Sequence, residues 1–167
     1  MEIDTTQTVA FTGHRHYKEE CTTALQETIR TLYAQGFRTF LSGMAIGFDL
    51  AAAEAVISLR EELTELRLGC IVPFKGMEHR FSAESRERFE RIIRSADHVE
   101  ILAEHYSHDI YFRRNNALIK HSTLVVAYFT GEGGGTAYTV RKALKKRRRL
   151  INLYADPQQI INFVESI

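Results

Sequence analysis

Short apolar runs alternate with longer amphipathic segments along the whole chain. Hydrophobic residues follow one another within each run, which is typical of strands that are covered on both faces of a parallel sheet. Strands are expected at Thr8–Thr12, Phe37–Leu41, Leu66–Pro73, Asp97–Leu102, Thr123–Phe129 and Leu150–Tyr154.

The segments between these runs carry apolar residues at helical spacing, as Leu25, Ile29 and Leu32 do in the first of them. Helices are expected at Tyr17–Gln35, Asp49–Leu59, Ser82–Ser95, Ile110–His121, from Thr136 to about Lys146, and at Gln158–Ile167. The alternation predicts an α/β fold with a single doubly wound, mostly parallel, Rossmann-like sheet and helices on both faces. We expect one domain over residues 1–167.

The composition is that of an ordinary globular protein. Hydrophobic residues make up 44% of the 167 residues, and no apolar run approaches the roughly 20 residues of a membrane span. The formal net charge is +1, from 22 basic and 21 acidic residues, so the overall charge requires neither a nucleic acid nor a membrane as partner. Two cysteines and an N-terminus without secretion-signal features predict a reduced, cytoplasmic location.

The most informative stretch is TGEGGGTAYTVRKAL, from Thr130 to Leu144, which directly follows an apolar run. Four of its first six residues are glycines: Gly131, Gly133, Gly134 and Gly135. Glycines let backbone N–H groups approach a ligand closely. Thr136 is expected to cap the helix that follows, whose N-terminus favours anions. The order strand, glycine loop, helix predicts a phosphate site; the alternative is a flexible, solvent-exposed loop.

Glycine-bearing turns follow three of the expected strands. They contain Gly13, the pair Gly43 and Gly47, and the glycines that follow Thr130. In a doubly wound sheet, ligands bind in the crevice beyond the carboxyl ends of the strands. We therefore expect the three turns to meet in one crevice.

Polar residues accompany these turns. Arg15 can meet a phosphate, with His14 beside a base or sugar; alternatively, the two form a solvated turn. Asp49 can accept hydrogen bonds from ribose hydroxyls, or serve only the N-terminus of its helix. Arg114 is the expected oxyanion ligand, with Asn115 beside it, because a guanidinium binds oxyanions through two hydrogen bonds. The alternative places Arg114 and the arginine before it at the surface.

Missing motifs narrow the function classes. The turn FTGHR has one glycine instead of GxGxxG, and GxxxxGK[ST] is absent, which argues against an NAD dehydrogenase and a P-loop ATPase. Without HExxH or paired CxxC we expect neither a metal nor a cofactor. Arg141–Arg149 holds seven basic residues. We interpret this run as a solvated helix end; a nucleic-acid patch is the alternative, although no aromatic residues interleave to stack bases.

The ordered motifs resemble the SLOG superfamily of Rossmann-like proteins, which includes the DprA/Smf DNA-processing proteins, the LOG phosphoribohydrolases and the YpsA-like proteins. The similarity is closest to the YpsA-like branch. The matching segments are FTGHR at Phe11–Arg15, SGMAIGFDLAAAEA at Ser42–Ala55, IVPF at Ile71–Phe74, RN at Arg114–Asn115 and GGGTAYTV at Gly133–Val140.

The resemblance implies a nucleotide-related ligand in the crevice. By comparison with LOG proteins, Arg114 matches the arginine of their R-K-x-x-M segment. Gly134, Gly135 and Thr136 match the end of their P-G-G-x-G-T-x-x-E loop. The glutamate of that loop is Thr139 here, and its proline is absent. This departure shifts the expectation from hydrolysis to binding.

We therefore expect a nucleotide-binding protein, for example a sensor of a nucleotide or an ADP-ribose-like molecule. The first alternative is a LOG-type N-glycosidic hydrolase, in which Asp49 or Glu132 replaces the missing acid and Arg114 assists. The second alternative is DprA-like binding of single-stranded DNA. The sequence is compatible with a homo-oligomer.

Overall fold

Six strands form one sheet in the part of the chain that the computed structural model describes, residues 2–154 and 157–166. The strands are β1 Thr8–Gly13, β2 Thr39–Ser42, β3 Arg67–Val72, β4 His98–Ile101, β5 Leu124–Tyr128 and β6 Arg149–Asn152. Their order across the sheet is β4-β3-β2-β1-β5-β6, and every neighbouring pair is parallel. The predicted parallel sheet is confirmed.

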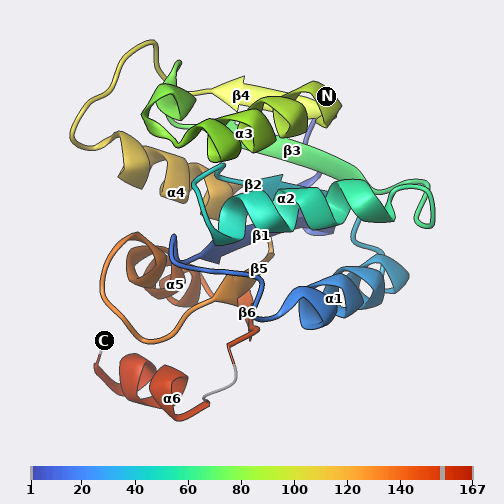
Figure 1. Cartoon of the computed structure of the whole chain (residues 1–167). Helices are drawn as coiled ribbons and strands as arrows, with labels where there is room; N and C mark the ends of the chain where they lie inside the picture. The colour runs from blue at the N-terminus through green and yellow to red at the C-terminus, as the bar shows by residue number, and fades with distance from the viewer. Residues whose placement is uncertain (1, 155–156, 167) are drawn as a thin grey trace.

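Helices cover both faces of this sheet. They are α1 Thr22–Ala34, α2 Phe48–Leu59, α3 Ala83–Ser95, α4 Ile110–Lys120, α5 Gly135–Lys145 and α6 Pro157–Ser166, with the short 3₁₀ helices η1 Thr5–Gln7 and η2 Met77–Arg80. On one face α2 packs between α1 and α3, whereas α4 packs on α5 on the other (Figure 1). The predicted α/β, Rossmann-like fold is confirmed.

The order of the strands explains which face each helix covers. From β1 to β4 the strands follow one another in one direction across the sheet, and right-handed crossovers place α1, α2 and α3 on the same face. The chain then returns to β5 on the opposite side of β1, so α4 and α5 cover the other face. The reversal between β1 and β5 is the position at which doubly wound sheets bind ligands.

The first helix begins at Thr22, later than the expected start at Tyr17. The segment before it forms a turn in which Glu19 has a φ of 66°. Tyr17 is buried, and its ring packs edge-on against Phe48 and Tyr128. Contacts with distant segments therefore determine the conformation of the residues before Thr22, and the helical spacing of apolar residues does not.

The other elements lie within two residues of their expected bounds. α3 begins one residue after Ser82, because the Ser82 hydroxyl accepts the N–H of Ser85 and caps the helix. Ile167, which the expected closing helix included, lies outside the described residues.

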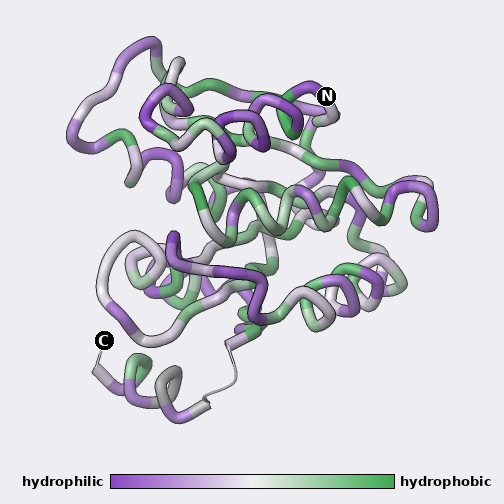
Figure 2. The backbone as a smooth tube through the Cα atoms, in the orientation of Figure 1, coloured by the Kyte–Doolittle hydropathy of each residue, from purple (hydrophilic) through white to green (hydrophobic). Residues whose placement is uncertain are grey.

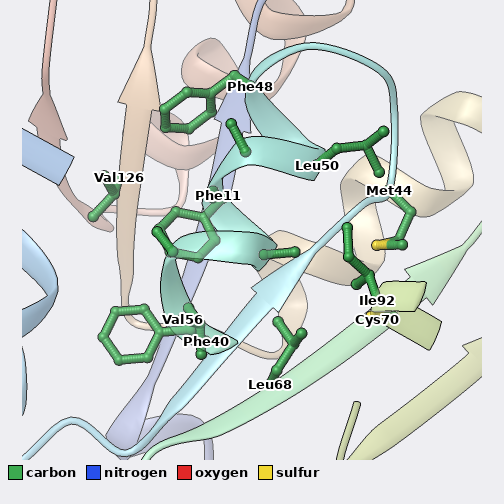
Figure 3. Packing of buried hydrophobic residues seen from close by; sticks show 14 of the residues in the cluster. Phe11, Phe40, Met44, Phe48, Leu50, Val56, Leu68, Cys70, Ile92 and Val126 are labelled. Atoms are coloured by element: carbon green, nitrogen blue, oxygen red, sulfur yellow. The ribbon is translucent and has the colours of Figure 1, made fainter. Parts of the chain in front are cut away.

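Aromatic and aliphatic side chains fill the space between the sheet and α2 (Figure 3). Phe11 of β1 stacks on Phe40 of β2 with ring centroids 5.6 Å apart, and Phe48 meets Phe11 edge-on. The alanines at residues 51–53 of α2 are buried, and their small side chains let the helix approach the sheet closely. This packing fixes the start of α2 at the carboxyl edge of the sheet.

Hydrophobic residues concentrate in the central strands and α2, whereas the outer helix α3 is largely hydrophilic (Figure 2). The buried residues of α3 are Phe89 and Ile92. No helix in the described ranges is long and apolar enough to cross a membrane.

Candidate functional site

A cavity of about 680 Å³ lies at the carboxyl edge of the sheet, beyond β1 and β5. Its walls come from the turns after β1 and β2, the start of α2, α4 with the loop before it, and the loop after β5 with the first turns of α5. The predicted site residues that line it are Gly13, His14, Arg15, Asp49, Arg114, Asn115, Glu132, Gly133, Gly134, Gly135 and Thr136. Residues predicted from distant parts of the sequence therefore share one cavity.

The loop after β5 ends at an open helix N-terminus. α5 begins at Gly135, and the capping position is Gly134, whose φ of 124° is rare for residues with a side chain. Among the described residues, no side chain caps the helix, and its first turn holds no acidic residue. The expectation that Thr136 caps the helix is wrong, because Thr136 already lies in the first turn. The backbone N–H groups of that turn therefore face the cavity, where they are available to an anion.

Arg114 is a cation that the fold buries in the cavity wall, with 7% of its surface exposed. Its Nη1 donates to the carbonyl oxygen of Gly43 over 3.1 Å, and its Nε donates to Oδ1 of Asn115 over 3.1 Å. The guanidinium carbon lies 5.4 Å from the centre of the Tyr111 ring. These contacts fix the guanidinium while its remaining N–H groups stay available to an oxyanion.

The two glycines of the turn after β2 position groups of the cavity without lining it, whereas Ala45 of the same turn belongs to the wall. A Cβ on Gly43 would lie 2.8 Å from Cδ of Arg114, and a Cβ on Gly47 would lie 2.4 Å from the carbonyl oxygen of Arg15. Neither glycine belongs to the cavity wall. Both allow the close packing that holds the two arginines in place.

His14 joins the turn after β1 to the loop after β5. Its ring is buried, and Nε2 accepts the backbone N–H of Thr130 over 3.0 Å, which assigns the ring proton to Nδ1. Burial, together with the neighbouring His16, lowers the pKa of His14. The two imidazole rings stack with centroids 4.8 Å apart, and Nε2 of His16 lies 3.5 Å from Oε2 of Glu132. The exposed side chains of His16 and Glu132 lie at the rim of the cavity.

Asp49 is a carboxyl group buried at the start of α2, with 5% of its surface exposed. Oδ2 accepts the N–H of Ala45 over 3.3 Å, and the backbone carbonyl accepts the Ser42 hydroxyl over 2.9 Å. Burial raises the pKa of Asp49 to about 6, against the weaker opposing effects of Arg114 and Arg15. Burial also lowers the pKa of Arg114. A carboxyl group with this pKa can exchange a proton near neutral pH, as acid–base groups do.

Asp49→Asn is expected to stabilise the folded protein at pH 8. Between pH 3.8 and about 6 the folded state binds a proton at Asp49 that the unfolded chain does not, so this group makes the free energy of unfolding fall as the pH rises through that window. The shift corresponds to about 3 kcal/mol at most, and asparagine avoids this cost while it keeps an acceptor for Ala45.

Urea unfolding of both proteins at pH 8 and pH 5 measures the effect, and the advantage of the variant should be smaller at pH 5. His14 titrates in both proteins and cancels in the difference. A variant less stable than the wild type at pH 8 would show instead that Asp49 acts mainly as the counter-ion of Arg114.

Sequence patterns do not reveal the aromatic wall that α4 and α5 build. Phe112 is 47% exposed and packs edge-on against Tyr138, with ring centroids 4.7 Å apart. The Tyr138 hydroxyl donates to Oδ1 of Asn116 over 3.0 Å. Tyr111 and His108 also line the cavity. A phenylalanine on the polar face of an expected helix was the available signal, but only the packing of α4 on α5 brings Phe112 to Tyr138.

The basic run of residues 141–149 begins at the carboxyl ends of the strands and extends toward their amino ends. Arg141, near the start of the run, lines the cavity and lies 5.6 Å from the centre of the Phe163 ring. The helix then runs away from the cavity, and Nε of Arg148 donates to the carbonyl oxygen of Ile119 at the end of α4. Arg141 alone among these basic residues belongs to the wall of this cavity.

Comparison with known proteins supports a family assignment. The model of the YspA SLOG family (YpsA) matches residues 9–160. A UPF0398 protein from Bacillus velezensis is 31% identical over 127 residues, which are 74% of this chain and 70% of the relative.

Two solved structures share the fold. DNA processing protein A (DprA) from Streptococcus pneumoniae superposes with a TM-score of 0.70 and 16% identity over 95% of this chain, and the match spans 56% of the pneumococcal chain. DprA from Helicobacter pylori, described by its single-stranded DNA binding mode, has a TM-score of 0.70 and 18% identity over 95% of this chain and 72% of its own. The resemblance in sequence motifs is thus confirmed, and the chain belongs to the YpsA family of the SLOG superfamily.

Proposed function

We propose that the cavity binds a nucleotide or a nucleotide-like molecule such as ADP-ribose. One observation carries this proposal: the open N-terminus of α5 and the buried Arg114 line the same cavity. Helix N-termini and guanidinium groups both bind phosphate oxygens. Arg15 adds a second, exposed cation to the same wall.

Each part of such a ligand has a matching group in the cavity. The phosphate would accept hydrogen bonds from backbone N–H groups of residues 133–136 and from Arg114. Asp49 would accept hydrogen bonds from the ribose hydroxyls. The base would stack on the exposed ring of Phe112, a type of contact that contributes about 1–3 kcal/mol per base.

Isothermal titration against nucleoside monophosphates, NAD and ADP-ribose tests this function. At least one of them is expected to bind with a Kd below about 1 mM, and the matching nucleoside without phosphate should bind far more weakly. Chromatography of the same samples detects release of free base, the product expected if Asp49 acts as the acid of a hydrolase. The proposal fails if no member of the panel binds at millimolar concentration, or if nucleosides bind as well as nucleotides.

Single-stranded DNA binding is a second candidate function. Arginines pair with aromatic rings along the carboxyl edge: the guanidinium carbon of Arg15 lies 5.6 Å from the centre of the Tyr111 ring, and that of Arg80 lies 5.0 Å from the centre of the Tyr106 ring. Such pairs suit the bases and phosphates of single strands. A short oligonucleotide in the same titrations distinguishes the two functions, because binding of DNA weakens steeply as salt is added.

A further inference from the structure

A second cavity, of about 310 Å³, adjoins the first. The two cavities share Arg15, Ala45 and Tyr111 in their walls. The remaining wall comes from the segments that follow β2 and β3, including η2 and the start of α3. The two cavities therefore lie next to each other along the carboxyl edge of the sheet.

Two guanidinium groups without a carboxylate partner line this second cavity. In the described part of the chain, neither Arg15 nor Arg80 forms an ion pair with a carboxylate. Arg15 lies instead against the ring of Tyr111, and Arg80 lies 5.0 Å from the ring centre of Tyr106 and 5.6 Å from that of Phe74. A guanidinium that rests against an aromatic ring keeps its N–H donors free for an oxyanion.

The rest of the second cavity combines hydroxyl groups with an apolar wall. Ser82 and Ser85 line it, and the Ser82 oxygen accepts the backbone N–H of Ser85 over 3.2 Å, which leaves the Ser82 hydroxyl proton free to donate. Met77 and Phe81 supply apolar surface. Cations and hydroxyls opposite an apolar wall suit a phosphoryl group that carries a sugar better than they suit a free inorganic anion.

Tyr111 connects the two cavities. Arg114 lies 5.4 Å from the centre of its ring and lines only the first cavity, whereas Arg15 lies 5.6 Å from the same centre and lines both. Positive charge thus continues from the first cavity past Tyr111 to Arg80 in the second. A ligand with a single phosphoryl group would occupy only one end of this series of cations.

We propose that the ligand extends past Tyr111 and places a second phosphoryl group, with the sugar attached to it, between Arg15 and Arg80. This inference rests on the proposed nucleotide binding and defines the ligand class as a molecule of two phosphorylated units. The units are joined by a diphosphate, as in ADP-ribose, or by a phosphodiester, as in a 5′-phosphorylated dinucleotide. Both linkages present the same chemistry to the second cavity.

Titration of AMP, ADP-ribose and the 5′-phosphorylated dinucleotide pApA tests the proposal. One two-unit ligand is expected to bind the wild type about tenfold more tightly than AMP, since a hydrogen bond to a charged group has an effect of this size. Arg80→Gln should remove most of that advantage and leave the affinity for AMP unchanged, because Arg80 does not line the first cavity. Ser85→Ala should also reduce the advantage of the two-unit ligand over AMP, by a smaller factor than Arg80→Gln.

Arg91→Gln is the matched control, because it also replaces an arginine by glutamine. Arg91 is an exposed residue of α3 that pairs with Glu87 and lines neither cavity. This control variant should change neither the affinity for AMP nor the affinity for the two-unit ligand. The second subsite is refuted, and nucleotide binding stands, if AMP binds as tightly as both longer ligands or if Arg80→Gln weakens AMP and the longer ligand alike. Absence of binding by all three ligands refutes this inference, and the proposed function falls with it if the other nucleoside monophosphates and NAD do not bind either.

Discussion

Arg114→Ala is expected to weaken nucleotide binding about 10- to 150-fold, the loss that accompanies removal of a hydrogen bond to a charged group. The guanidinium is buried in the cavity wall, and Gly43 and Asn115 hold it there through Nη1 and Nε. Binding therefore needs little further ordering of this side chain, and alanine removes a donor that water cannot replace at the same place.

The neighbouring arginine provides a matched control for this variant. Arg113 is exposed and does not line the cavity, so Arg113→Ala removes the same charge from the same helix and should leave the affinity unchanged. Isothermal titration of both variants measures the difference, after circular dichroism has established that each is folded. Equal losses in the two variants would mean that only the overall charge of α4 attracts the ligand.

Arg114→Lys adds a test of geometry. Lysine keeps the positive charge but lacks the planar pair of donors that binds an oxyanion through two hydrogen bonds. We expect an affinity between those of the wild type and Arg114→Ala.

The sequence was sufficient to predict the layers of the fold and much of the cavity. Continuous apolar runs and helical spacing are local signals, and they located the strands and helices because most of the core follows that alternation. The convergence of the turns at Gly13 and after β5 followed from the same logic, since parallel strands present their carboxyl ends at one edge. Asp49 was a candidate because it lies at the start of a helix at that edge, and Arg114 was a candidate because a guanidinium binds oxyanions through two hydrogen bonds.

Non-local packing decided the features that the sequence did not reveal. Tyr17 lies in a turn because its ring packs against Phe48 and Tyr128 from other segments. The wall formed by Phe112 and Tyr138 exists only because α4 packs on α5. Local spacing contains no information on which helix faces meet, so these residues could be recognised only in the folded chain.

Gly43 and Gly47 illustrate a second limit. A glycine in a turn after a strand has the same appearance in the sequence whether its backbone contacts a ligand or another part of the protein. The structure gives both glycines protein neighbours: Arg114 for Gly43, and the backbone of His14 and Arg15 for Gly47. Their contribution to binding is therefore indirect, through the residues that they allow to pack.

Gly47→Ala is expected to lower the free energy of unfolding by more than about 3 kcal/mol, because two costs add at this residue. Its φ of 82° is unfavourable for alanine, and the new Cβ would lie 2.4 Å from the carbonyl oxygen of Arg15 and 2.6 Å from that of His14. These are backbone atoms that cannot rotate away. The His14 carbonyl also accepts the N–H of Phe48 at the start of α2 over 3.2 Å, so relief of the clash would separate α2 from the turn after β1.

Gly36→Ala separates the two costs. Gly36 has a φ of 105°, and a Cβ there would meet nothing within 4 Å, so this variant carries only the conformational cost of about 1–2 kcal/mol. Urea unfolding of both variants measures the difference, which is the steric cost of placing a Cβ at residue 47 against the turn that holds His14 and Arg15. Because that turn lines the cavity, Gly47→Ala should also weaken nucleotide binding, whereas Gly36→Ala should not. Equal stability losses in the two variants would show that the turn after β1 adjusts freely, and such a turn could not hold Arg15 in a fixed position for a ligand.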